Sequence, residues 1–164
     1  NGFGAGLPPR PDNGKDWALL AAVLADARIK PAPAQITWMR EAFLDLLRIR
    51  KGSTLFRMRT ATDVAARLAF RNVGPDQNPV VLAVHLDGRD YPGAGFREVL
   101  YFINVAPEAQ VLTVAEDAGK PWRLHPVQAS PQAADQRPRR EARVEAATGR
   151  FTLPGRTAVV FVVP

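Results

Sequence analysis

The sequence contains no cysteine. Disulfides, thiolate zinc sites and cysteine nucleophiles are therefore excluded, while the cellular compartment stays open. Long hydrophobic runs are missing as well: no stretch approaches the ~18 apolar residues of a membrane-spanning helix, so we expect no membrane partner. The Gly- and Pro-rich beginning of the chain has no apolar core for a signal peptide. The chain begins at Asn1 rather than Met, so we expect a processed product or a fragment.

Histidine and serine are scarce, which limits the chemistry that the chain can support. The two histidines are His85, at the end of an apolar stretch, and His125, before a proline. Neither has a carboxylate at metal-ligand spacing in the sequence, so we predict core or edge histidines and no metal or other cofactor. Ser53 and Ser130 lie outside any Gly-x-Ser-x-Gly motif. The glycine-rich residues 2–6 lack a preceding strand and are followed by prolines, which argues against a nucleotide site.

The net charge of +6 permits nucleic-acid binding through counterion release. The basic residues are scattered, however, and one dense cluster, residues 137–140, lies in a polar stretch without aromatic neighbours. A nucleic-acid binder usually displays a basic stripe or a stacking platform. We therefore expect no nucleic-acid partner, and keep binding through Arg137, Arg139 and Arg140 as an alternative.

The N-terminal third of the sequence predicts helices. Residues 1–16 have loop composition, and residues 16–25 follow an Asp cap with good helix formers. Pro33 can begin a second helix, which runs over about 34–51 and ends at Gly52. Its apolar residues occupy about half of the helical wheel, with Glu41, Asp45, Arg48 and Arg40 opposite and Arg50 within the apolar arc. An apolar arc of this width predicts that the helix packs against two separate parts of the protein. The apolar residues are Ile36, Trp38, Met39, Ala42, Phe43, Leu46, Leu47 and Ile49.

After Gly52 the pattern changes to period two, which predicts strands separated by turns. One helical turn is expected over residues 62–66 with Thr62 as its N-cap, and residues 128–142 have the composition of a mobile loop. Short strands without intervening helices favour an antiparallel sandwich. The last strand is apolar on both faces and is therefore expected at a sheet centre. The predicted strands are Arg67–Asn72, Val80–Leu86, Val99–Asn104, Gln110–Val114, Arg123–Val127, Arg143–Ala146, Arg150–Leu153 and Thr157–Val163.

Paired carboxylates or exposed aromatics would give the chain a route to carbohydrate chemistry. Asp87 with Asp90, and Glu116 with Asp117, have hydrophilic, turn-like neighbours that would not raise a carboxyl pKa. We therefore predict solvated turn residues rather than an acid–base pair. Trp122 and Tyr91 lie near loops, although far apart in the sequence, and a free-standing carbohydrate-binding module that uses them is a second alternative.

Several motifs, taken together and in order, resemble the C-terminal end of bacterial pullulanase-type alpha-1,6-glucosidases, debranching enzymes of the alpha-amylase superfamily (glycoside hydrolase family 13). They extend over nearly the whole chain, which makes the combination more specific than any single motif. The matching stretches are NGFGAGLP at 1–8, KPAP at 30–33, FLDLLRIR at 43–50, LFR at 55–57, NVGPDQ at 72–77, PEAQ at 107–110, LHPVQ at 124–128, ATG at 147–149 and FTLP at 151–154.

The resemblance implies a mixed α and β fold in two parts. Residues 1–52 are expected to be the loop and helices that close a (β/α)8 barrel, otherwise absent, and residues 53–164 an antiparallel β-sandwich. The family's catalytic carboxylates lie upstream of Asn1, so no catalytic residue is assigned and the chain alone is expected to be inactive. Asp12 and Asn13 are expected near the substrate cleft, although turn formation explains them equally well. The implied partners are the barrel of the same polypeptide and, through the intact enzyme, alpha-glucan; an extracytoplasmic location is compatible with the family.

Overall fold

The computed structural model describes residues 6–164, of which residues 6–40 form one compact unit and residues 41–164 a second. The first unit is helical. Residues 10–16, predicted as loop, form two short helical turns, and the following helix has the predicted bounds with Asp16 at its N-cap. The elements are α1 (Arg10–Asn13), η1 (Gly14–Asp16), α2 (Trp17–Ala25), η2 (Ala27–Ile29) and the first turns of α3 (Pro33–Gly52).

Helix α3 begins at Pro33 and includes Gly52, close to the predicted bounds. Within the second unit its buried residues are Asp45 and Ile49, one turn apart, and the neighbouring apolar residues Phe43 and Leu47 are 57% and 42% exposed. The prediction that Asp45 lies on the solvent side was wrong. Its carboxylate is stabilised there because it accepts a 2.8 Å hydrogen bond from the backbone N–H of Ala134.

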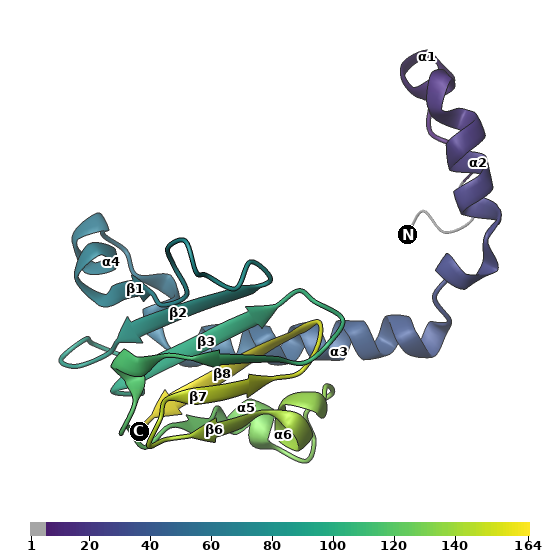
Figure 1. Cartoon of the computed structure of the whole chain (residues 1–164). Coiled ribbons are helices and arrows are strands. Elements are labelled where there is room, and N and C mark those ends of the chain that lie inside the picture. The colour runs from purple at the N-terminus through teal and green to yellow at the C-terminus, as the bar shows by residue number, and fades with distance from the viewer. Residues whose placement is uncertain (1–5) are drawn as a thin grey trace. The chain divides into compact units, whose positions relative to one another are not determined.

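The second unit contains two antiparallel sheets (Figure 1). The five-stranded sheet has the order β1-β2-β3-β8-β5, and the three-stranded sheet has the order β4-β7-β6. β8 lies between β3 and β5, so the prediction of a central position for this apolar strand is confirmed. The strands are β1 (Leu68–Phe70), β2 (Val81–Asp87), β3 (Glu98–Asn104), β4 (Gln110–Thr113), β5 (Arg123–Leu124), β6 (Arg143–Glu145), β7 (Arg150–Leu153) and β8 (Thr157–Val163).

Both faces of the five-stranded sheet contribute to an apolar core. On one face, Phe102 and Phe161 pack with Phe151 of the smaller sheet, with ring centroids 4.9–6.2 Å apart. On the other face, Val84 and Val160 belong to a second cluster with Ile49, so α3 lies on this side (Figure 1). Burial on both faces explains why β8 has no polar alternation.

Short helices occupy several of the connections. Thr60 caps α4 by accepting the N–H of Asp63, so the predicted cap at Thr62 was wrong by two residues. The region 128–142, predicted as a mobile loop, contains the end of one helix and a whole second one, each with a proline in its first turn. The elements are η3 (Thr54–Arg57), α4 (Ala61–Arg67), η4 (Ala115–Asp117), α5 (Pro126–Ala129) and α6 (Arg137–Glu141). In the described part of the chain, no helix has the length and apolar character required for membrane crossing.

Candidate functional site

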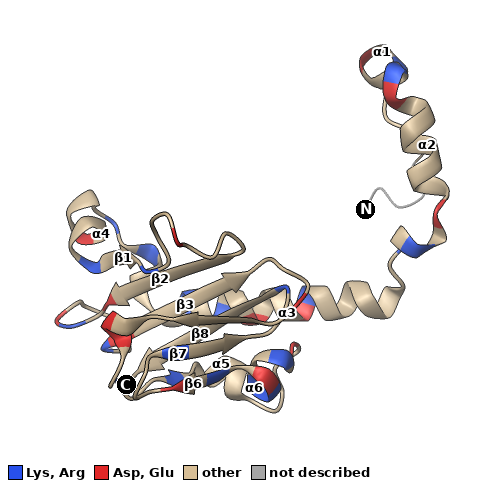
Figure 2. Cartoon of the chain, viewed as in Figure 1, with Lys and Arg blue, Asp and Glu red and all other residues tan. Residues whose placement is uncertain are grey.

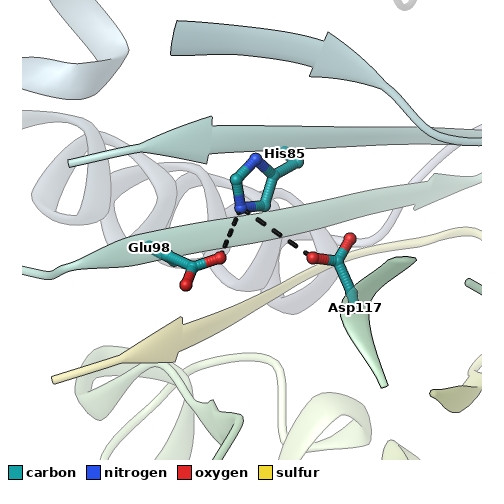
Figure 3. Close-up of side chains that lie close together, drawn as sticks. All are labelled: His85, Glu98 and Asp117. Carbon is teal, nitrogen blue, oxygen red and sulfur yellow. Dashed lines mark hydrogen bonds and ion pairs between the residues drawn. The ribbon is translucent and has the colours of Figure 1, made fainter. Parts of the chain in front are cut away.

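A cluster of ionisable side chains lies at one end of the core between the sheets (Figure 3). His85 alternates along β2 with the core residues Val81 and Ala83, so the three side chains share one face of the strand. Glu98 shares a face of β3 with the core residue Leu100 in the same way. Alternation along the strands therefore directs both side chains to the core side of the sheet. Asp117, at the end of η4, completes the group with a side chain that is 0% exposed.

Two cationic side chains, Lys120 and Arg71, form hydrogen bonds with the carboxylates of the cluster. His85 Nε2 lies 2.7 Å from Glu98 Oε2 and 3.9 Å from Asp117 Oδ1. Lys120 Nζ bridges the two acids, 2.5 Å from Glu98 Oε2 and 2.6 Å from Asp117 Oδ1. Arg71 Nε donates to Asp117 Oδ2 at 2.8 Å, so each oxygen of the buried carboxylate faces a positive charge.

Opposing effects act on the ionisation of these groups. Burial pushes the pKa of Asp117 upward, but hydrogen bonds from Lys120 and Arg71 outweigh it, and the pKa lies below its ordinary value. Burial likewise opposes ionisation of Glu98, while Lys120 and His85 leave the pKa of this carboxyl lowered. Burial favours neutral Lys120, yet its two carboxylate partners raise the pKa of its ammonium group. The acids thus remain ionised, which suits a structural ion network better than proton transfer.

The cluster also has the size of a metal site, since ligand atoms of His85, Glu98 and Asp117 all lie within 4.8 Å of one another. The donor set of one imidazole and two carboxylates is suitable for a transition metal. However, Lys120 Nζ already lies within hydrogen-bonding distance of both carboxylates, and Arg71 supplies a second positive charge. The two negative charges are therefore balanced by the protein itself, and we assign no metal here.

The predicted acidic pairs are not an acid–base pair in the structure. Glu116 is exposed as expected, but the prediction of a solvated Asp117 was wrong, because Arg71 and Lys120 compensate its burial. Asp87 is half-buried and receives several hydrogen bonds from Arg89, which lower its pKa to about 2. A carboxyl group with so low a pKa is a poor proton donor near neutral pH.

The aromatic residues of the carbohydrate-binding alternative do not form an exposed platform. Trp122 is buried, and its Nε1 donates to the Asp117 carbonyl at 2.9 Å. Tyr91 is half-buried, and the guanidinium of Arg67 covers its ring at 4.7 Å from the centroid. Tyr91 borders an open hollow of about 860 Å³ that is lined mainly by charged residues. A row of exposed rings for a sugar chain is therefore not present in these positions.

The arginine-rich cluster is also part of the fold. Arg137 begins α6, pairs with Asp135 at 2.7 Å and donates to the Gly155 carbonyl at 3.0 Å, while Pro138 is buried. Glu141 ends the same helix, and Figure 2 shows acidic and basic residues together on α6. This mixed arrangement gives no support to the nucleic-acid alternative.

His125 is buried near the second apolar cluster. Its Nδ1 accepts the backbone N–H of Val127 at 3.2 Å, which caps α5, and its ring meets Phe96 edge to face at 5.2 Å. Nε2 has no hydrogen-bond partner among the described residues. Burial lowers the pKa of His125 to about 4, so the imidazole is neutral at pH 7. For both His125 and His85, the prediction of core or edge histidines is confirmed.

The residues expected near a substrate cleft lie in the first unit. Asn13 donates a side-chain hydrogen bond to the Pro9 carbonyl at 3.3 Å, and its backbone N–H donates to the same oxygen at 3.1 Å. Asp12 is exposed in the short helix α1. The local hydrogen bonds give Asn13 a role in the turn, and Asp12 is available to solvent. Residues 2–5 of the glycine-rich stretch lie outside the described residues.

Fold and site together define a mixed helix-and-sheet domain that carries a buried ion cluster in which two carboxylates are balanced by Lys120 and Arg71. The family model of the C-terminal part of pullulanase-type alpha-1,6-glucosidases matches residues 1–164. The chain is 33% identical over 169 residues to pullulanase 1, chloroplastic, of Arabidopsis thaliana, covering 99% of the chain and 17% of that protein. It is 29% identical over 168 residues to the pullulanase of Klebsiella pneumoniae, covering 100% of the chain and 15% of that protein.

The solved structures that resemble this chain are pullulanases as well. PulA from Klebsiella oxytoca matches with a TM-score of 0.77 and 27% identity, over 97% of this chain and 15% of that one. The apo pullulanase of Klebsiella pneumoniae matches with a TM-score of 0.76 and 30% identity, over 97% of this chain and 17% of that one. The chain belongs to the family of C-terminal domains of pullulanase-type alpha-1,6-glucosidases. It spans less than a fifth of the length of these relatives.

Proposed function

We propose that this chain is the non-catalytic C-terminal portion of a debranching glycoside hydrolase that cleaves alpha-1,6 bonds in pullulan and starch-derived dextrins. Family membership supports this activity for the intact protein, and the small share of the relatives that the chain covers supports a catalytic barrel elsewhere in the polypeptide. In this proposal the two sheets are the layers of a sandwich, and residues 1–52 and 53–164 are the barrel-closing and sandwich parts.

The observation that carries the proposal is the exposed apolar side of α3. Ile49 packs on the sheet, whereas Phe43, Leu46 and Leu47 remain 39–57% exposed. Apolar residues in such a row on a helix usually cover another body. The side chain of Arg50 is also exposed, and it forms no hydrogen bond or ion pair within the described part of the chain. We infer that the barrel covers this side of the helix and supplies a partner for Arg50.

The supporting role of the domain can be tested by comparing two proteins. The full polypeptide encoded by the reading frame should release reducing sugar from pullulan, and the purified chain Asn1–Pro164 should release none. Release of maltotriose by the chain alone would contradict the assignment of the catalytic carboxylates to the upstream part. Failure of the full polypeptide to hydrolyse pullulan would contradict the proposed activity itself.

A second test concerns the short helical turns that precede α2. If residues 12 and 13 approach the cleft, Asp12→Ala in the full polypeptide should raise the KM for pullulan several-fold with little change in stability. Asp26→Ala is the matched control, because Asp26 is also acidic but pairs locally with Arg28. Equal KM values for the two variants would remove Asp12 from the proposed substrate contacts.

A further inference from the structure

The open hollow that Tyr91 borders lies between three segments of the second unit: η3 with the two residues after it, α4, and the connection from β2 to β3. Its volume of about 860 Å³ is within the range of small-molecule sites, roughly 300–1,000 Å³. It is here called the arginine hollow, because three of its lining residues are arginines. The lining residues are Thr54, Arg57, Arg59, Asp63, Arg67, Asp90, Tyr91 and Pro92.

The positive charge of these arginines is not balanced by carboxylates of the protein. Arg67 donates hydrogen bonds from Nη1 to two backbone carbonyls, at 3.2 and 2.7 Å, and Arg57 donates to one carbonyl at 3.2 Å. Arg59 is exposed and forms no hydrogen bond within residues 6–164. A carbonyl oxygen carries no net charge, and none of the three guanidinium groups forms an ion pair in the described part of the chain. The hollow therefore offers positive charge to a ligand.

Two acidic residues border the same hollow and are available as hydrogen-bond acceptors. Asp63 Oδ2 accepts the hydroxyl of Thr60 at 2.7 Å, which leaves Oδ1 without a donor in the described part of the chain. Asp90 is exposed, and its carboxylate accepts no hydrogen bond within residues 6–164. A ligand that satisfies the whole hollow needs an anionic group for the guanidinium groups and hydroxyl groups for the carboxylates.

The connection from β2 to β3 is held in place by the segment that follows α3. Thr54 Oγ1 donates to the Pro92 carbonyl at 2.7 Å, and the backbone N–H of Thr54 donates to the Gly93 carbonyl at 3.1 Å. The guanidinium of Arg67 lies over the ring of Tyr91, 4.7 Å from its centroid. The sides of the hollow are thus connected to one another without a ligand, which lowers the cost of ordering them on binding.

We propose that the arginine hollow binds a sugar phosphate. A phosphate monoester carries a charge of about −1.5 to −2 at pH 7 and presents three strong acceptor oxygens, which suit the planar donors of guanidinium groups. The hydroxyl groups of the sugar donate to Asp63 and Asp90. A bare anion would be repelled by these two carboxylates, and a neutral sugar would leave the arginines without a negative partner. The proposal goes beyond the debranching activity and does not depend on it.

Calorimetric titration of the full polypeptide with three probes tests the ligand class. The probes are glucose 6-phosphate, inorganic phosphate and glucose. Glucose 6-phosphate should bind at least about ten-fold more tightly than either of the other two, because it alone provides both the anionic group and the hydroxyl groups. Equal affinities for glucose 6-phosphate and inorganic phosphate, or tighter binding of glucose, would overturn the proposal.

Two matched substitutions test the site. Arg59→Gln should weaken the binding of glucose 6-phosphate about ten-fold or more, because it removes a charge-assisted hydrogen bond. Arg123→Gln is the control: it removes the same charge from an exposed position on β5, at the opposite edge of the five-stranded sheet from β1, which directly follows α4. It should change the Kd by less than about two-fold. Equal losses in the two variants would contradict the site, and far-ultraviolet circular dichroism shows that both variants are folded.

Amide hydrogen exchange locates the bound probe within the full polypeptide. Saturating glucose 6-phosphate should slow exchange in residues 54–67 and 88–93 and leave residues 137–153 unchanged. At the same ligand concentration, Arg59→Gln should show less protection in the first two segments. Protection confined to other parts of the polypeptide would place the ligand elsewhere and overturn the proposal.

Discussion

Lys120 Nζ lies 2.6 Å from Asp117 Oδ1, and the side chain of Asp117 is 0% exposed. An isolated buried carboxylate is strongly disfavoured, so this contact and the opposite one from Arg71 are what allow Asp117 to remain ionised. The same lysine reaches Glu98 on β3, while Arg71 follows β1. One buried charge thus connects η4 with two separate parts of the five-stranded sheet.

Replacing Asp117 should therefore be costly. Asp117→Asn keeps the shape of the side chain but leaves Lys120 and Arg71 without their shared negative partner, and breaking such a pair costs roughly 3 kcal/mol. Urea unfolding of the chain at pH 7 should show a loss of about this size. Glu116→Gln, at the exposed neighbouring position, should change the free energy of unfolding by less than about 0.5 kcal/mol. Similar values for the two variants would show that the ion network contributes little.

The cluster illustrates which part of a site can be read from sequence. His85 and Glu98 lie near each other because β2 and β3 pair as antiparallel neighbours. The sequence predicted both strands but not their pairing. Asp117 was expected in solvent because its neighbours Glu116 and Gly119 have turn character. Its burial depends on Arg71 and Lys120, which approach from elsewhere in the fold. The residues next to Asp117 in the sequence do not indicate that its side chain is buried against these two cations.

The neutral, buried His125 should make stability depend on mildly acidic pH. Its pKa is lowered from 6.5 to about 4, so between these values the unfolded chain binds a proton that the folded chain does not. The stabilising contribution is complete above pH 6.5 and is lost as the pH falls toward 4. Between pH 7 and 5 the loss should be roughly 2 kcal/mol.

Comparison with His125→Asn isolates this effect. Asparagine can still cap α5 through its side-chain oxygen but does not titrate. Urea unfolding at pH 7 and pH 5 should show a larger loss for the unsubstituted chain than for the variant. Equal losses would mean that His125 is not responsible for the pH dependence.

The fold was predicted best where hydrophobic period and turn residues agree. The strands Arg150–Leu153 and Thr157–Val163 have the predicted bounds, because both are rich in β-branched and aromatic residues and each is preceded by a turn that contains glycine, Gly149 and Gly155 respectively. α5 and α6 were missed because each is shorter than two turns and has no apolar period. Pro126 and Pro138, at first-turn positions, are the signal that could have indicated them.

Gly155 should be intolerant of a side chain. A Cβ at this position would lie 1.9 Å from the Pro107 carbonyl oxygen, which belongs to backbone and cannot rotate away. Gly155→Ala should therefore lower the free energy of unfolding by about 2 kcal/mol or more. Gly52→Ala is the matched control, because nothing lies within 4 Å of its Cβ position and alanine favours helix by about 0.5 kcal/mol. If the melting temperatures of the two variants shifted in the same direction, the predicted clash between a side chain at position 155 and the Pro107 carbonyl oxygen would be contradicted.

The buried side of α3 offers a test that separates an ion pair from a hydrogen bond. Asp45 contacts Arg48 at 2.5 Å and accepts the backbone N–H of Ala134 at 2.8 Å. The Arg48 side chain is 60% exposed, so the ion pair should contribute under about 0.5 kcal/mol. The hydrogen bond to the carboxylate, which is 12% exposed, should contribute about 2 kcal/mol.

Asp45→Ala should accordingly destabilise the chain several times more than Arg48→Ala does in urea unfolding. Hydrogen exchange provides the second readout: the Ala134 amide should lose protection in Asp45→Ala and keep it in Arg48→Ala. If both variants lose the same stability and the amide stays protected, the ion pair rather than the bond to Ala134 holds α3 to this segment. The expected result would explain why an acidic residue occupies the buried side of a helix whose leucines face outward.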